Sequence, residues 1–162
     1  MSNSHKLKIG LDYHGVIDNN VIYFSKFCDY AQKNGCKIFI ITGGPGILIK
    51  DKLKNYNIAY DFVFAISDYY QALNIIIQQD NGSLSIPENM WNSGKADFCY
   101  RNKIDIHIDD STKYFKDFVT PYCYYDKKKN KGLIPPDTNL DFNEAPELVL
   151  QKIKSYLTNC KN

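Results

Sequence analysis

The chain has 162 residues, a length typical of one folded domain that spans residues 1–162. An apolar content of 44% with 14% aromatic residues excludes the disordered class, and no run approaches the 18 apolar residues that predict a membrane span. A net charge of +2 is too small to indicate a nucleic-acid partner, which therefore has only weak support.

The first part of the chain predicts two strands, each followed by a helix. Residues 8–12 form an apolar run broken by Asp12, a pattern that indicates a buried strand ending in a functional loop. Residues 21–33 carry apolar side chains at helical spacing, and an Asn-Gly pair ends this helix. The Ile-rich run at 37–42 is typical of a strand covered on both faces, and a glycine-rich turn leads from it into a predicted helix at 47–55.

The remainder of the chain continues this alternation. The polar, proline-containing segment 127–143 is predicted to be a loop, and residues 80–82 a turn. The same patterns predict strands at 61–66, 104–109 and 120–125, and helices at 69–79, 94–102, 112–118 and 146–157.

Strands that alternate with helices of about ten residues indicate βαβ units. The predicted fold is therefore α/β, a three-layer Rossmann-like parallel sheet with helices on both faces. In such a sheet the functional site lies beyond the carboxyl ends of the strands. Three predicted strand ends carry polar groups, namely Asp12, Thr42 and the pair Asp109-Asp110.

These residue types together suit phosphoryl-transfer chemistry. Converging carboxylates from Asp12 and Asp109 need a cation, and their hard oxygen atoms suit Mg²⁺. A carboxylate beside Mg²⁺ and a phosphate can attack phosphorus, which would make Asp12 a nucleophile. Thr42 offers a hydroxyl and Gly43 a backbone N–H at the start of a helix, where a phosphate would be held. A lysine would neutralise the transferring group.

The same residues resemble the four motifs of the haloacid dehalogenase-like (HAD) superfamily. Residues 9–17 are similar to its first motif, an apolar strand followed by D-x-D-G-[TV], and residues 40–43 to its second, which ends in Ser or Thr. Lys95 is placed like the lysine of the third motif, and residues 104–110 resemble the fourth, an apolar strand that ends in two aspartates.

The resemblance implies a role for each matching position. Asp12 would be nucleophile and metal ligand, and the backbone carbonyl of His14 a second ligand. Asp109 would be the third protein ligand of Mg²⁺, with Asp110 either a ligand or a holder of metal-bound water. Lys95 would bind the phosphoryl oxygens and restrain Asp12. The remaining phosphate contacts would come from Thr42, Gly43 and Gly44.

His14 departs from the family pattern, because phosphatases of this family carry an aspartate there that transfers protons. Histidine can do acid–base work near neutrality, so one hypothesis is a phosphohydrolase that cleaves a phosphomonoester through an aspartyl-phosphate. The alternative is a catalytically weak or inactive domain that serves as a binding or regulatory module.

The spacing between the motifs leaves no room for a large cap domain, so a capless protein is expected, with at most a small flap around residues 80–93. Its substrate would be a phosphorylated small molecule or the phosphate terminus of a larger one. Oligomerisation stays open, because capless relatives either act on macromolecules or close their sites by oligomerising.

Several other residues allow two interpretations. Lys127 to Lys131 are either solvated or contact a polyanion, and Trp91 either packs in the core or touches a ligand. Asp105 and His107 share a strand face with Asp109 and are expected to be satisfied groups rather than ligands. The five cysteines form no CxxC pair and no signal peptide is evident, so a reduced, cytoplasmic protein with mostly buried thiols is expected.

Overall fold

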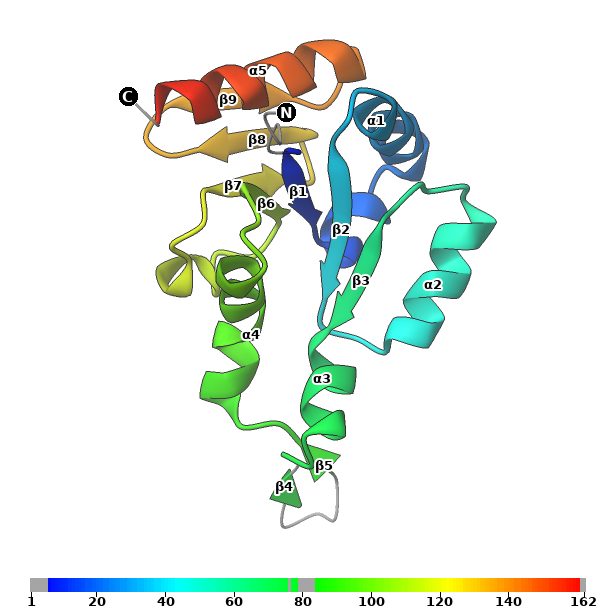
Figure 1. Cartoon of the computed structure of the whole chain (residues 1–162), viewed down its shortest axis with the longest axis vertical. Coiled ribbons are helices and arrows are strands. Elements are labelled where there is room, and N and C mark those ends of the chain that lie inside the picture. Colours follow the sequence, from blue (N-terminus) through cyan, green and yellow to red (C-terminus); the bar gives the residue numbers. More distant parts are fainter. Residues whose placement is uncertain (1–5, 76, 79–83, 161–162) are drawn as a thin grey trace, which may run out of the picture.

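Seven strands form one mixed sheet in this computed structural model, which describes residues 6–75, 77–78 and 84–160 (Figure 1). The sheet order is β3-β2-β1-β6-β7-β8-β9. Its strands are β1 (Lys8–Leu11), β2 (Lys37–Thr42), β3 (Phe62–Ala65), β6 (Ile106–Asp109), β7 (Tyr122–Asp126), β8 (Lys131–Ile134) and β9 (Thr138–Asp141).

Five of these strands, β3-β2-β1-β6-β7, run parallel, as the alternation of strands and helices predicted. The chain leaves β1 towards β2 and β3, then crosses to β6 on the other side of β1. This reversal makes the carboxyl ends of β1 and β6 the point where a crevice opens in a doubly wound sheet. The arrangement is compatible with a Rossmann-like fold.

The prediction of an all-parallel sheet with a loop at 127–143 was wrong. β8 pairs antiparallel with β7, and β9 pairs antiparallel with β8. Ile134 and Leu140 are fully buried, but charged and polar residues separate the few apolar positions of this segment. The apolar pattern was therefore too sparse to stand out beside the prolines.

Helices cover both faces of the sheet, which confirms that part of the prediction. One face packs against α1 (Val21–Lys33), α2 (Gly46–Asn55) and α5 (Pro146–Asn159) through one large buried cluster. The other face packs against α3 (Ile66–Ala72) and α4 (Glu88–Arg101) through a smaller cluster that includes Ile41, Phe64 and Cys99. Two short turns, η1 (Tyr13–Ile17) and η2 (Phe115–Asp117), follow β1 and β6.

The segment between α3 and α4 differs most from its prediction. The helix expected at 69–79 is α3, which begins and ends earlier, and the helix expected at 94–102 is α4, which begins at Glu88. Pro87 fixes the chain direction before α4, and Glu88 complements the positive end of the helix. β4 (Ile77–Gln78) and β5 (Leu84–Ser85) form a small antiparallel pair beyond these helices (Figure 1). The turn predicted at 80–82 and the start of the predicted flap lie outside the described residues.

Two further expectations concern the whole chain. Among the described residues no helix has the length and apolar character needed to cross a membrane. The five cysteines are free thiols, and four of them are buried, as expected.

Candidate active site

The strand register brings Asp12 and Asp109 side by side. Leu11 of β1 pairs with Ile108 of β6, and the backbone N–H of Asp12 donates to the carbonyl of Ile108 at 2.9 Å. The residue after each of these partners is an aspartate, so both carboxylates emerge at the same edge of the sheet. Asp12 is 6% exposed and Asp109 is fully buried.

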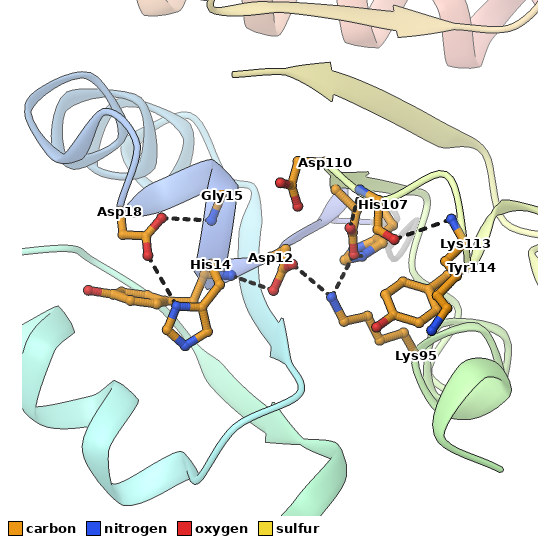
Figure 2. A network of polar contacts seen from close by, with 12 residues as sticks. Asp12, His14, Gly15, Asp18, Lys95, His107, Asp110, Lys113 and Tyr114 are labelled. Atoms are coloured by element: carbon orange, nitrogen blue, oxygen red, sulfur yellow. Dashed lines mark hydrogen bonds and ion pairs between the residues drawn. The ribbon is translucent and has the colours of Figure 1, made fainter. Parts of the chain in front are cut away.

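Lys95 links the two carboxylates from the middle of α4. Its Nζ lies 2.8 Å from Asp12 Oδ2 and 2.6 Å from Asp109 Oδ2, and its side chain is almost completely buried (Figure 2). The other Asp12 oxygen accepts the backbone N–H of Tyr13 at 2.7 Å. The Asp12 carboxylate is therefore held at both oxygens, by Lys95 at one and by the Tyr13 backbone at the other.

The pKa values show that this buried group lacks positive charge. Burial raises the pKa of Asp12 to about 7; the charge of Lys95 opposes this rise and that of Asp109 adds to it. Burial also disfavours the charged forms of Asp109 and Lys95. The hydrogen bond with His107 and the charge of Lys95 nevertheless hold the pKa of Asp109 below its usual value. The charges of Asp12 and Asp109 hold the pKa of Lys95 above its usual value. One ammonium thus faces two carboxylates, and Asp12 is the carboxylate whose ionised form is disfavoured.

His107 supports Asp109 from below, a role that the sequence did not assign. Its Nε2 lies 3.1 Å from Asp109 Oδ2, and burial lowers the pKa of His107, so the neutral ring donates this hydrogen bond. The second oxygen of Asp109 accepts the N–H of Ser111 at 2.9 Å. His107 thus supports Asp109 and is not part of the group of three carboxylates. The expectation of a fully satisfied side chain was wrong, because its buried Nδ1 has no hydrogen-bond partner among the described residues. The period-two spacing from Asp109 is the signal that could have suggested the contact.

Asp110 completes the acidic group. One oxygen from each of Asp12, Asp109 and Asp110 lies within 4.8 Å of the other two, a grouping that could hold a metal ion. Asp110 approaches the backbone of Gly15 so closely that a Cβ there would overlap its carboxylate. Gly15 also has φ +80°, so both the conformation and the space require glycine.

A fit to a divalent cation follows from these observations. Asp12, Asp109 and Asp110 carry three negative charges, against which the described residues set Lys95 and, at 3.2 Å from Asp110, Lys127. Burial and the charge of Asp109 raise the pKa of Asp12, and a cation bound beside Asp12 would offset both effects. Three carboxylates that converge within ligand distance are the donor set that hard divalent cations prefer.

His14 is held in place by Asp18, which the sequence analysis missed. His14 Nδ1 lies 3.1 Å from Asp18 Oδ2, and the other Asp18 oxygen accepts the N–H of Gly15 at 2.6 Å (Figure 2). His14 Nε2 faces Gly44, 3.9 Å from where a Cβ on that glycine would lie. A carboxylate orients one nitrogen while the other lies near Gly44 and can bind a partner, an arrangement that suits proton transfer. The spacing of four residues between His14 and Asp18 was the available signal.

The second strand end presents the predicted phosphate-binding residues. Thr42 ends β2 and is fully buried, and its Oγ1 has no hydrogen-bond partner among the described residues. Such an orphaned hydroxyl is costly unless a ligand or water satisfies it. Gly43 and Gly44 follow Thr42 and line the cleft described next.

A cleft of about 360 Å³ opens over these groups. Of the predicted site residues, Asp12, His14, Gly43, Gly44, Lys95 and Asp110 line it, whereas Thr42 and Asp109 lie buried behind its wall. Gly15, Trp91, Ser111, Tyr114 and Lys127 complete the lining. Trp91 therefore faces the cleft, although from α4 rather than from a flap.

The lysine-rich turn between β7 and β8 is largely paired with carboxylates. This pairing favours a solvated turn over a polyanion-binding surface, and Lys127 is the lysine of this turn that lines the cleft. The pairs are Lys127 with Asp110 at 3.2 Å, Lys129 with Asp126 at 3.3 Å and Lys131 with Asp141 at 3.4 Å.

Comparison with known proteins adds no identification: a scan against models of protein families gave no match, and a search of curated proteins gave none. The geometry of the cleft is what supports the function proposed below.

Proposed function

We propose that this chain is a capless HAD-like, Mg²⁺-dependent phosphohydrolase that cleaves a phosphomonoester through an aspartyl-phosphate on Asp12. The observation that carries the proposal is the fixed carboxylate of Asp12, bound to Lys95 and grouped with two further aspartates at the base of a cleft. A cytoplasmic setting belongs to the same proposal, because the described cysteines are free thiols.

The residues of the acidic group divide the binding work. Asp12, Asp109 and Asp110 would hold Mg²⁺, with the backbone carbonyl of His14 as a further ligand. Mg²⁺, when bound, supplies positive charge beside the phosphoryl oxygens and keeps Asp12 ionised. Thr42, Gly43 and Gly44 would bind the phosphoryl oxygens from the β2 side, and Lys95 from the α4 side. The unsatisfied Thr42 hydroxyl supports this assignment.

The first chemical step forms a bond between a carboxylate oxygen of Asp12 and phosphorus, and breaks the bond from phosphorus to the ester oxygen. Protonated His14 donates from Nε2 to the departing alcohol oxygen, so a neutral alcohol leaves. Asp18 holds Nδ1 and orients the ring for this transfer. Lys95 stabilises the charge that spreads over the phosphoryl oxygens.

The second step reverses the proton transfer. A water molecule attacks phosphorus, neutral His14 accepts its proton, and the bond between phosphorus and Asp12 breaks. Inorganic phosphate and the free carboxylate of Asp12 are the products, so the residues return to their starting states.

Hydrolysis of an aryl phosphate with Mg²⁺ tests the proposal. We expect Asp12→Asn to lower kcat by about 10³-fold or more, because the amide cannot form the acyl-phosphate. Asp51→Asn, which changes an exposed aspartate of α2, is the matched control and should leave kcat unchanged. Equal activity of wild type and Asp12→Asn, or equal activity with Mg²⁺ removed by chelation, would contradict the proposal.

The second candidate is a catalytically silent binding module, which the replacement of the family's aspartate by His14 favours. In this case the wild type would bind Mg²⁺ and phosphate without turnover, and His14→Asp would create hydrolysis. Steady turnover of any phosphomonoester by the wild type eliminates this candidate.

A further inference from the structure

Two aromatic side chains form one wall of the cleft, and the mechanism above uses neither. Trp91 comes from α4 and Tyr114 from the segment after β6, and both are partly exposed and line the cleft. Phosphate binding and phosphoryl transfer require charged groups and hydrogen-bond donors, not aromatic rings. Their presence therefore needs an explanation from another part of the substrate.

The indole ring of Trp91 is fixed in place. Its six-membered ring packs on Gly43, where a Cβ would come within 2.7 Å of Cζ2, and its Nε1 donates to the Tyr114 hydroxyl at 3.3 Å. Part of the ring also packs against the smaller core cluster. A ring held at several points loses little conformational freedom when a ligand stacks on it.

The aromatic wall adjoins the phosphate position. Trp91 touches Gly43, one of the proposed phosphate contacts, and the Tyr114 ring centre lies 5.2 Å from Lys95 Nζ (Figure 2). If the phosphate of a ligand lies between Gly43 and Lys95, the first few atoms of its alcohol group lie close to Trp91 and Tyr114. His14 and Lys127, which are polar, line other parts of the cleft.

We infer that the cleft selects a phosphomonoester whose alcohol carries a planar aromatic ring, which packs against Trp91 and Tyr114. This inference rests on the proposed function for the phosphate position. Among biological phosphomonoesters, the nucleoside monophosphates and the phosphorylated ends of nucleic acids have this chemistry. A cleft of about 360 Å³ is at the lower end of the range for small-molecule sites, so it suits one phosphate with one ring system.

Trp91 itself provides the measurement, because it is the sole tryptophan of the sequence. In the Asp12→Asn protein with Mg²⁺, we would titrate benzyl phosphate and cyclohexylmethyl phosphate and follow tryptophan fluorescence. The two probes match in size, charge and alcohol class and differ in aromaticity. We expect saturable quenching and a Kd about fivefold lower for benzyl phosphate, whereas equal Kd values would overturn the inference.

Variants identify the rings responsible. Tyr114→Leu keeps the reporter and should reduce the preference for benzyl phosphate by at least half, and Trp91→Leu, followed by calorimetry, should abolish it. Trp91→Phe keeps a ring and should retain part of the preference. Tyr100→Leu removes an aromatic ring that is 68% exposed and does not line the cleft, so it should change neither Kd. A preference that survives both leucine variants would overturn the inference.

Two further probes separate the biological sources. An adenosine 5′-monophosphate Kd about tenfold below that of ribose 5-phosphate would support a nucleoside ring, and equal values would count against one. A 5′-phosphorylated oligonucleotide that binds as tightly as the mononucleotide would support a nucleic-acid end, and weaker binding a free nucleotide. Failure of the proposed function gives a different result, namely no hydrolysis by wild type whatever the ring preference of binding.

Discussion

Two cavities border α4, and they differ in chemistry more than in size. Trp91 and Lys95 line the polar cleft of about 360 Å³, where buried carboxylates outnumber cations. Phe98 and Met90 line a second cavity of about 490 Å³ between α3, α4 and β3, which we call the apolar cavity. The larger space has the simpler chemistry.

The difference lies in how well each region satisfies its own groups. In the apolar cavity, Phe98 stacks on Phe64 at 4.1 Å and on Phe62 at 5.9 Å between ring centres, contacts that stabilise without a ligand. In the cleft, burial raises the pKa of Asp12, and the buried hydroxyl of Thr42 has no hydrogen-bond partner among the described residues. Both groups would be stabilised by a bound ligand. Grouped carboxylates and an unpaired hydroxyl, and not volume, therefore distinguish the cleft as the candidate site.

The largest effect on this contrast is expected from Lys95→Met, which keeps the size of the side chain and removes its charge. Two buried carboxylates then repel each other, and we expect a loss of about 3 kcal/mol in the free energy of unfolding at neutral pH. Activity should fall by about 10²-fold or more, because the phosphoryl oxygens lose a charged donor.

Chemical denaturation and steady-state kinetics measure the two effects. Lys113→Met is the control. Lys113 is exposed, and its ion pair with exposed Glu88, at 3.9 Å, should contribute little to stability. The stability loss should shrink at acidic pH, because protonation of Asp12 removes the repulsion. A variant as stable as wild type would show that the cleft is no more strained than the surface.

An intermediate effect is expected from pH, through the raised pKa of Asp12. The free protein binds a proton at Asp12 below about pH 7, and Mg²⁺ needs the ionised carboxylate. Mg²⁺ affinity should therefore fall as the pH decreases below 7, by up to about tenfold per unit, and proton release should accompany binding. Calorimetry in buffers of different ionisation enthalpy measures both quantities. Asp12→Asn should bind Mg²⁺ without releasing a proton. A wild-type Mg²⁺ affinity that does not change between pH 5.5 and 8 would refute the assignment of the proton to Asp12.

The sequence predicted the polar side of this comparison better than the apolar side. Asp12, Thr42 and Asp109-Asp110 could be placed together because parallel strands align their carboxyl ends, a rule that depends only on strand order. β1, β2 and α1 lie where apolar periodicity placed them, because each has a clear pattern of its own.

What the sequence did not show depends on side-chain orientation and on which strands pair. Asp18 and His107 reach His14 and Asp109 only in particular side-chain rotamers. Lys127 lies beside Asp110 because β7 pairs with β6. The start of α4 was misplaced because its apolar residues do not follow one helical stripe. That helix packs against the core on one side and the cleft on the other, so no single stripe exists.

The smallest effect is expected on the apolar side, from Phe98→Leu. The substitution removes the stacking on Phe62 and Phe64 and should lower the free energy of unfolding by about 1–2 kcal/mol. Phe98 lies on α4 three residues after Lys95, so a shift of the helix would also move the Lys95 ammonium. Unchanged kcat and KM, measured beside the denaturation midpoint, would therefore show that α4 holds the cleft through the ion pairs of Lys95. A parallel loss of activity would mean instead that packing in the apolar cavity positions the residues of the cleft, and the two cavities would form one functional unit.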